Sequence, residues 1–126
     1  MSCAKVFTTA ALLPLLCAAM PAAAMGPRAD LDQFAICAGR FSAMATQRPA
    51  DHTDFAARRG WFAELAEAAR PNSVPADYVA QVELEAWAGF MVLLHTETAS
   101  FNSNIAKGAA RARQRGLAEC ERLIFG

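Results

Sequence analysis

Three short breaks divide this chain into segments of helical pattern, and they constrain its fold more than any other feature. They are RPAD (48–51), RPNSVP (70–75) and SFNSN (100–104). The first two contain proline, and the third is rich in serine and asparagine, which prefer turns and helix caps to helix interiors. Between the breaks, apolar residues recur every three or four positions, as in helices that bury one face. The chain therefore predicts four helices in succession.

We expect these helices at residues 30–47, at 51 to about 69, at 75 to about 97 and at about 104–124. No stretch alternates with the period of two that a half-buried strand requires, and alanine, the best helix former, is abundant. Short connections favour antiparallel neighbours. The predicted fold is therefore all-α, a four-helix up-down bundle.

Residues 1–24 have the pattern of a secretory signal peptide. Lys5 precedes an apolar run over 6–19, and Ala22 and Ala24 then supply the small residues of a cleavage site. The apolar run is shorter than the roughly 20 residues that span a bilayer, so we expect no transmembrane span after cleavage. Residues 25–126 would then form a single helical domain in the periplasm or outside the cell.

The charge balance excludes one class of function. The chain has 12 basic and 12 acidic residues, and removing Lys5 leaves a net charge of −1. A general nucleic-acid binder carries a strongly basic surface, so nucleic acid is not an expected partner.

The two cysteines outside the leader, Cys37 and Cys120, are predicted to form a disulfide between the first and last helices. In an up-down bundle these helices are antiparallel neighbours. Cys37 lies seven residues into the first, and Cys120 lies about four residues from the end of the last, so the thiols come to similar heights. An exported protein is expected to be oxidised.

Other uses of this cysteine pair remain as alternatives. One alternative is that both cysteines are buried and remain free thiols. A redox-active pair is usually a C-x-x-C at a helix start, and these cysteines are remote from each other. A zinc site needs further ligands, yet His52 and His95 lie in other contexts without ligand spacing. We favour the structural disulfide and expect no metal.

Several stretches resemble a group of small secreted bacterial α-helical proteins that have two cysteines and no assigned function. They are CAGRFSAM (37–44), DFAARRGWFAELAEAA (54–69), ASFNSN (99–104) and AARARQRGLAECERLI (109–124). The resemblance implies a helical exported domain with the same two cysteines. It implies no activity, so no catalytic residue transfers.

Three arginines are candidates for contact with an anion or a partner. Arg40 follows Cys37 by three positions, and the competing interpretation pairs it with Glu119 or Glu121 of the last helix. Arg111 and Arg115 are one helical turn apart and share a face, which could bind a partner or lipid headgroups. The competing interpretation is an ordinary solvated face.

Two tryptophans and one histidine complete the candidates. Trp61 is expected to cap one end of the core, and Trp87 to border the apolar stripe of the third helix. Either becomes the leading partner contact if it is exposed. His95 is a candidate ligand, although we expect it at the edge of the core, hydrogen-bonded to the backbone or to Glu97.

The sequence contains no Ser-His-Asp set, no nucleophile elbow and no glycine-rich phosphate loop. We therefore predict a non-catalytic binding or interaction module without a cofactor, whose partner is a protein of the cell envelope. The alternative is a carrier of a small ligand or metal that uses the bundle interior near His95. Contact with a membrane surface through Arg111 and Arg115 is a weaker hypothesis.

Overall fold

The computed structural model describes residues 27–48 and 52–126, which form four helices and no strand. They are α2 (Pro27–Gln47), α3 (His52–Ala69), α4 (Ala76–Ala99) and α5 (Ser103–Phe125). The predicted all-α bundle is confirmed. The predicted leader, residues 1–24, and the expected first residue of the second helix, Asp51, lie outside the described residues.

The ends of the helices follow the chemistry of the breaks. Asn102 caps α5, because its side-chain oxygen accepts hydrogen bonds from the backbone N–H groups of Asn104 (2.9 Å) and Ile105 (3.3 Å). The predicted turn between the third and fourth helices is thereby confirmed. The first helix begins at Pro27, three residues before the expected start, since proline is tolerated at the first helical position.

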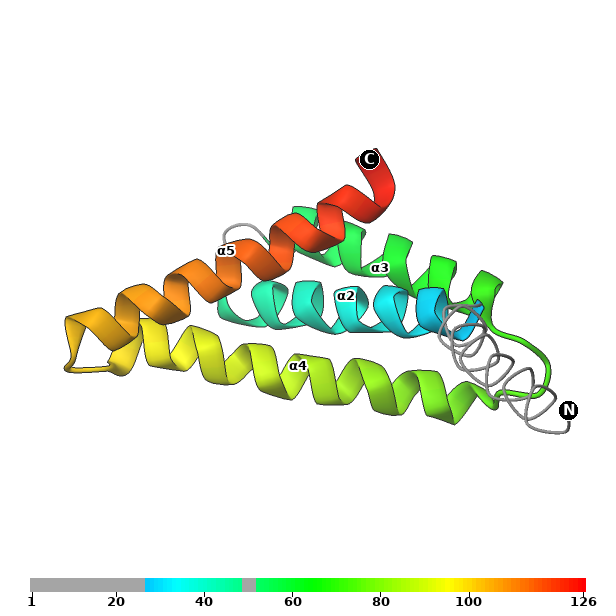
Figure 1. Ribbon diagram of the computed structural model, residues 1–126, viewed down its shortest axis with the longest axis horizontal. Coiled ribbons are helices and arrows are strands. Elements are labelled where there is room, and N and C mark those ends of the chain that lie inside the picture. The colour runs from blue at the N-terminus through cyan, green and yellow to red at the C-terminus, as the bar shows by residue number, and fades with distance from the viewer. Residues whose placement is uncertain (1–26, 49–51) are drawn as a thin grey trace, which may run out of the picture.

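Successive helices run antiparallel, and α2 lies at the centre of the molecule (Figure 1). It packs against α3 and α4 on opposite sides and against α5, whereas α3 and α4 touch each other only slightly. Helices α4 and α5 meet at their connecting turn and then diverge (Figure 1), and the Cys37–Cys120 disulfide joins α5 to α2.

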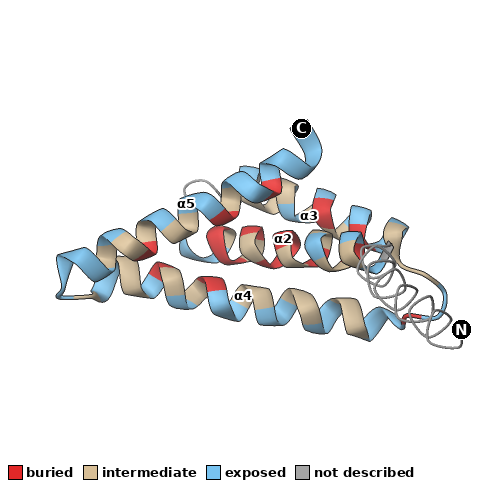
Figure 2. Ribbon diagram, viewed as in Figure 1, coloured by how far each residue is buried: buried red, intermediate tan, exposed pale blue. Residues whose placement is uncertain are grey.

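The central position of α2 explains why it is buried around most of its circumference (Figure 2). Its buried apolar residues are Leu31, Ala35, Cys37, Ala38, Phe41, Ala43 and Met44. The apolar stripe seen in the sequence supplies the side toward α3 and α5, where Phe41 stacks on Phe62 with 5.7 Å between ring centroids. Ala35, Gly39 and Ala43 form a second face of small residues at four-residue spacing, which allows α4 to approach closely.

Candidate functional site

The predicted disulfide is present between α2 and α5. Cys37 and Cys120 are bonded, with 5.6 Å between their Cα atoms, and both are buried. The bond closes a loop between residues 83 positions apart. In the chain-entropy description a loop of this length contributes about 4.5 kcal/mol to stability. The disulfide therefore holds α5 to the centre of the bundle, at a place where α5 has diverged from α4.

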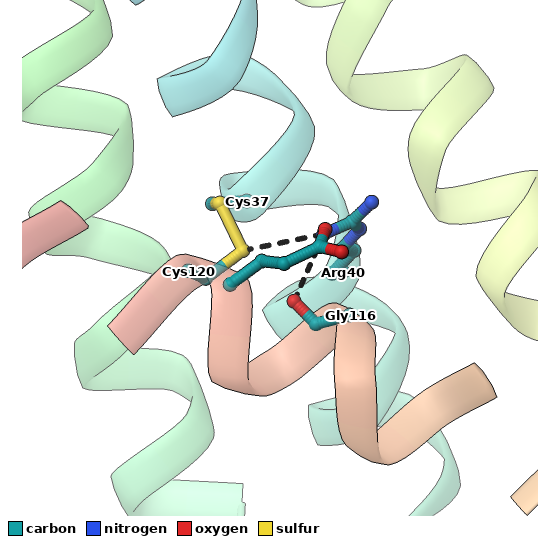
Figure 3. Close-up of a disulfide and its surroundings, with 5 residues drawn as sticks. Cys37, Arg40, Gly116 and Cys120 are labelled. Carbon is teal, nitrogen blue, oxygen red and sulfur yellow. Dashed lines mark hydrogen bonds and ion pairs between the residues drawn. A yellow bond between two sulfur atoms is a disulfide. The ribbon is translucent and has the colours of Figure 1, made fainter. Parts of the chain in front are cut away.

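Arg40 lies directly beside this disulfide (Figure 3). Its Nη1 atom donates to the Gly116 carbonyl oxygen at 2.9 Å, lies 3.2 Å from Glu119 Oε2 and lies 3.7 Å from Cys120 Sγ. The guanidinium also borders a surface hollow of about 440 Å³ between α2 and α5. Arg40 already donates to groups of α5. The interpretation that pairs it with Glu119 therefore fits the structure better than the interpretation of Arg40 as a binding site for an external anion.

Other ion pairs also join different helices. Arg58 Nη1 of α3 lies 2.6 Å from Glu121 Oε1 of α5, and Arg59 Nη2 lies 2.6 Å from Glu83 Oε1 of α4. Three of these four side chains are more than a third exposed, and Glu83 is 19% exposed, so each pair is open to solvent and contributes little to stability on its own. They also show which carboxylates already have a cation as partner within the chain.

The pair of Arg113 with Glu97 is the most enclosed of these. The two side chains are only 13% and 19% exposed, and two hydrogen bonds of 2.8 and 2.9 Å join them. The hydrogen bonds from Arg113 lower the pKa of Glu97 below its ordinary value, although partial burial opposes this shift. The pair connects α4 to α5 near their turn, and it turns Arg113 away from Arg111 and Arg115.

Trp61 is half exposed and belongs to an apolar surface between α3 and α5. Its side chain is 50% exposed, and it lines a surface hollow of about 430 Å³. The apolar residues of this hollow are Trp61, Leu65, Ala68 and Ile124, which we call the Trp61 patch, and Glu64 is the charged residue that lines it with them. Phe62 is buried as its place on the apolar stripe predicts, whereas Trp61, expected at one end of the core, is half exposed and so becomes the leading partner contact.

Trp87 is less accessible than Trp61. It packs against a core cluster that contains Ala43, Met44, Phe90 and Leu94. Its remaining surface borders a shallow hollow beside Leu84 and Arg59. This position at the border of the stripe is the one predicted, and it makes Trp87 mainly a packing residue.

Arg111 and Arg115 are exposed on the outer side of α5. No carboxylate of the described residues forms an ion pair with either of them. Their expected common face is therefore present and free. Lys107 belongs to the same basic stretch of the sequence, and Arg122, seven residues after Arg115, extends the face toward the end of α5.

His95 does not lie where it was expected. It is exposed on α4, whereas the preceding residue Leu94 takes the buried position. Glu97, the expected partner of its side chain, accepts hydrogen bonds from Arg113 instead. Within the described part of the chain, no three His, Cys, Asp or Glu residues lie together as metal ligands would.

Helical spacing assigns Leu65 and Ile124 to the apolar stripes of their helices, yet both are exposed, and nothing in the sequence indicates a shared surface. They come from different helices, so only their packing reveals that they share a surface with Trp61.

Family models, curated proteins and solved structures were all compared with this chain, and none matches it. The resemblance to small secreted bacterial proteins therefore stays a prediction. In the described residues, no helix is both long enough and apolar enough to cross a membrane.

Proposed function

We propose that this chain is an exported, non-catalytic interaction module that docks a protein of the cell envelope on the Trp61 patch. The observation that carries the proposal is the half-exposed Trp61, set beside exposed Leu65 and Ile124 in one hollow. Large aromatic side chains surrounded by apolar neighbours are typical anchors of protein interfaces.

Two features support export. The predicted leader would direct the chain across a membrane, and the Cys37–Cys120 bond is of the kind that persists in oxidising compartments. Both support a periplasmic or secreted location, and a partner of the exported protein would then belong to the envelope as well.

The patch also indicates what the partner surface contains. Its centre is apolar, and the exposed Glu64 that borders it forms no ion pair with any described cation. A complementary surface would insert an apolar side chain beside Trp61 and place a lysine or arginine near Glu64. The ion pair of Arg58 with Glu121 is already satisfied within the chain and would remain at the rim.

Site-specific photo-cross-linking in the exporting cell tests this proposal. A benzoyl-phenylalanine at position 61 or 65 should give one discrete adduct, because both positions face the partner. The matched control is position 88, an exposed alanine on α4 outside the patch. Absence of an adduct at both patch positions, or the same adduct at position 88, would contradict the proposal.

Native mass spectrometry of the protein recovered from the same cells distinguishes the carrier alternative from the interaction module. A carrier would leave the cell with a bound small molecule or metal, which native mass spectrometry of the oxidised protein detects as extra mass. The exposed position of His95 and the close packing of Phe90 and Leu94 do not favour this outcome. Extra mass lost on denaturation, together with no cross-link at position 61, would replace the interaction module by a carrier.

A further inference from the structure

The outer side of α5 carries four exposed cations, of which Arg122 also lines the hollow between α2 and α5. We call them the basic ridge, which consists of Lys107, Arg111, Arg115 and Arg122. Spacings of four and seven residues bring all four onto one side of a helix that has 3.6 residues per turn. All four are exposed, and none forms an ion pair with a carboxylate of the described residues. Glu119 follows Arg115 by four positions and borders the ridge, and its carboxylate is paired with Arg40 of α2 at 3.2 Å.

The ridge reflects a separation of charge between helices. Helix α5 has five basic and two acidic residues, a net charge of +3, whereas α4 has four acidic residues and no lysine or arginine. One of the five cations, Arg113, is neutralised by Glu97 of α4. The remaining positive charge therefore concentrates on the outward side of α5, in a chain that is nearly neutral as a whole.

Exposed phenylalanines lie at both ends of the ridge. Phe101 in the turn before α5 is fully exposed, and Phe125, the last residue of α5, is 72% exposed. Phe125 follows Arg122 by three positions and so shares its side of the helix. A row of cations between two exposed aromatic residues matches the interfacial layer of an anionic bilayer, where headgroups meet the cations and rings enter the acyl boundary.

The arrangement favours a lipid surface over a nucleic acid. Proteins that bind single strands interleave aromatic rings with cations so that successive bases can stack. Here the rings lie only at the ends, and about 22 Å of straight helix separates Lys107 from Arg122. A flat charged surface can contact all four cations at once.

We propose that the basic ridge binds the anionic phospholipid headgroups of a membrane and holds the protein with α5 flat against that surface. The ridge lies on a different side of α5 from Ile124, which is two positions beyond Arg122. The Trp61 patch therefore stays accessible while the ridge is occupied. The proposal does not depend on the identity of the protein partner.

Vesicle sedimentation with the disulfide-bonded protein is the test. Vesicles of phosphatidylglycerol and phosphatidylethanolamine in about equal amounts should bind the protein, and phosphatidylcholine vesicles should not. Raising the salt from about 0.05 M to about 0.5 M should release it, because the Debye length then falls well below the distance between exposed charges. No binding to the phosphatidylglycerol vesicles at low salt would overturn the proposal.

Substitutions assign the binding to the ridge. Each neutralised cation should weaken binding about fivefold, so Arg111→Gln with Arg115→Gln should weaken it about 25-fold. The matched control is Arg28→Gln, which removes one exposed cation from the start of α2, outside the ridge, and should leave binding unchanged. A double variant that binds like the parent protein, or a control that is equally impaired, would overturn the assignment.

Substitutions of the two phenylalanines distinguish binding to a membrane from binding to a soluble polyanion. Phe101→Ser and Phe125→Ser should each weaken vesicle binding several-fold without changing any charge, because an inserted ring is lost. Polyphosphate serves as the soluble polyanion. The protein should bind it more weakly than it binds vesicles, and neither phenylalanine substitution should change its affinity for polyphosphate. Equal binding to polyphosphate and vesicles, with no effect of either phenylalanine, would assign the ridge to soluble polyanions and overturn the membrane proposal. Circular dichroism of each variant confirms that the helices are retained.

Discussion

Gly39 of α2 lies against the backbone of Glu83 of α4, so closely that a methyl group at position 39 would collide with the Glu83 carbonyl oxygen. Such a group would also come within 2.8 Å of the Ala86 Cβ atom and 2.9 Å of the Trp87 nitrogen. This contact allows α2, already packed against α3 and α5, to bury a further side against α4. It is the reason the helix is central.

Gly39→Ala should destabilise the protein by about 3 kcal/mol, because the colliding atoms belong mainly to a helix backbone that cannot move aside without separating the helices. Urea unfolding followed by circular dichroism measures this. The control is Gly60→Ala in α3, where a methyl group meets nothing within 4 Å and alanine should stabilise the helix by up to about 1 kcal/mol. Equal effects of the two substitutions would show that the helices do not approach at Gly39.

Replacing both Cys37 and Cys120 by alanine should lower the free energy of unfolding by up to about 4.5 kcal/mol, through the loss of a cross-link between distant positions. The parent protein should be destabilised by dithiothreitol, and the double variant should be insensitive to it. Urea unfolding with and without the reductant measures both effects. An unchanged midpoint in the reduced parent protein would show that packing alone holds α5 in place.

Arg40→Met should cost about 1–2 kcal/mol, because Arg40 donates to the partly enclosed carbonyl of Gly116. Glu119→Gln should cost less than about 0.5 kcal/mol, since the Glu119 side chain is 55% exposed and its ion pair is open to solvent. Urea unfolding of the two variants makes the comparison. A larger loss for the glutamate variant would mean that the ion pair, and not the hydrogen bond to the carbonyl, stabilises this contact of α2 with α5.

The stability contribution of Glu97 should depend on pH. Hydrogen bonds from Arg113 lower the pKa of Glu97 in the folded protein, so this carboxyl binds its proton more weakly when folded than when unfolded. Its contribution is therefore present above the ordinary pKa of glutamate and is lost as the pH falls through the lower folded pKa. Glu97→Gln should cost about 1–2 kcal/mol at neutral pH.

Unfolding midpoints of the parent protein and of Glu97→Gln, measured from neutral to acid pH, check this behaviour. The difference between them should shrink as the pH falls. Glu85→Gln is the control, because Glu85 is exposed and, among the described residues, accepts a side-chain hydrogen bond only from the nearby amide of Gln81. A difference that grows toward acid pH would reverse the expected sign and exclude the ion pair as its source.

Several features of the candidate sites followed from spacing alone. The common side of Arg111 and Arg115, and the different side of Arg113, come directly from the period of the helix. The pairing of Cys37 with Cys120 followed from their distances to the helix ends together with the up-down order. Each of these depends on local geometry or on one simple assumption about topology, and for that reason each could be read before the structure.

Other features depend on how far the helices diverge. His95 follows a run of apolar residues, so the sequence favoured an enclosed position, yet α4 has apolar residues on nearly every side and its partners cover only some of them. Trp61 and Ile124 are separated by 63 positions in the sequence. They share a surface because the end of α5 lies near α3, where the Cys37–Cys120 disulfide and the Arg58–Glu121 ion pair join α5 to the other helices.

By itself, the sequence determined the four helices of the described residues, the turn at Asn102 and the cysteine pair, because breakers, caps and helical periodicity act within a few residues of each other. Only the tertiary structure decided that α2 is the central helix and that the Trp61 patch and the basic ridge face solvent. Those outcomes depend on which of several apolar or small-residue faces find partners. That choice is made by close packing between distant segments, at contacts such as Gly39 against Glu83.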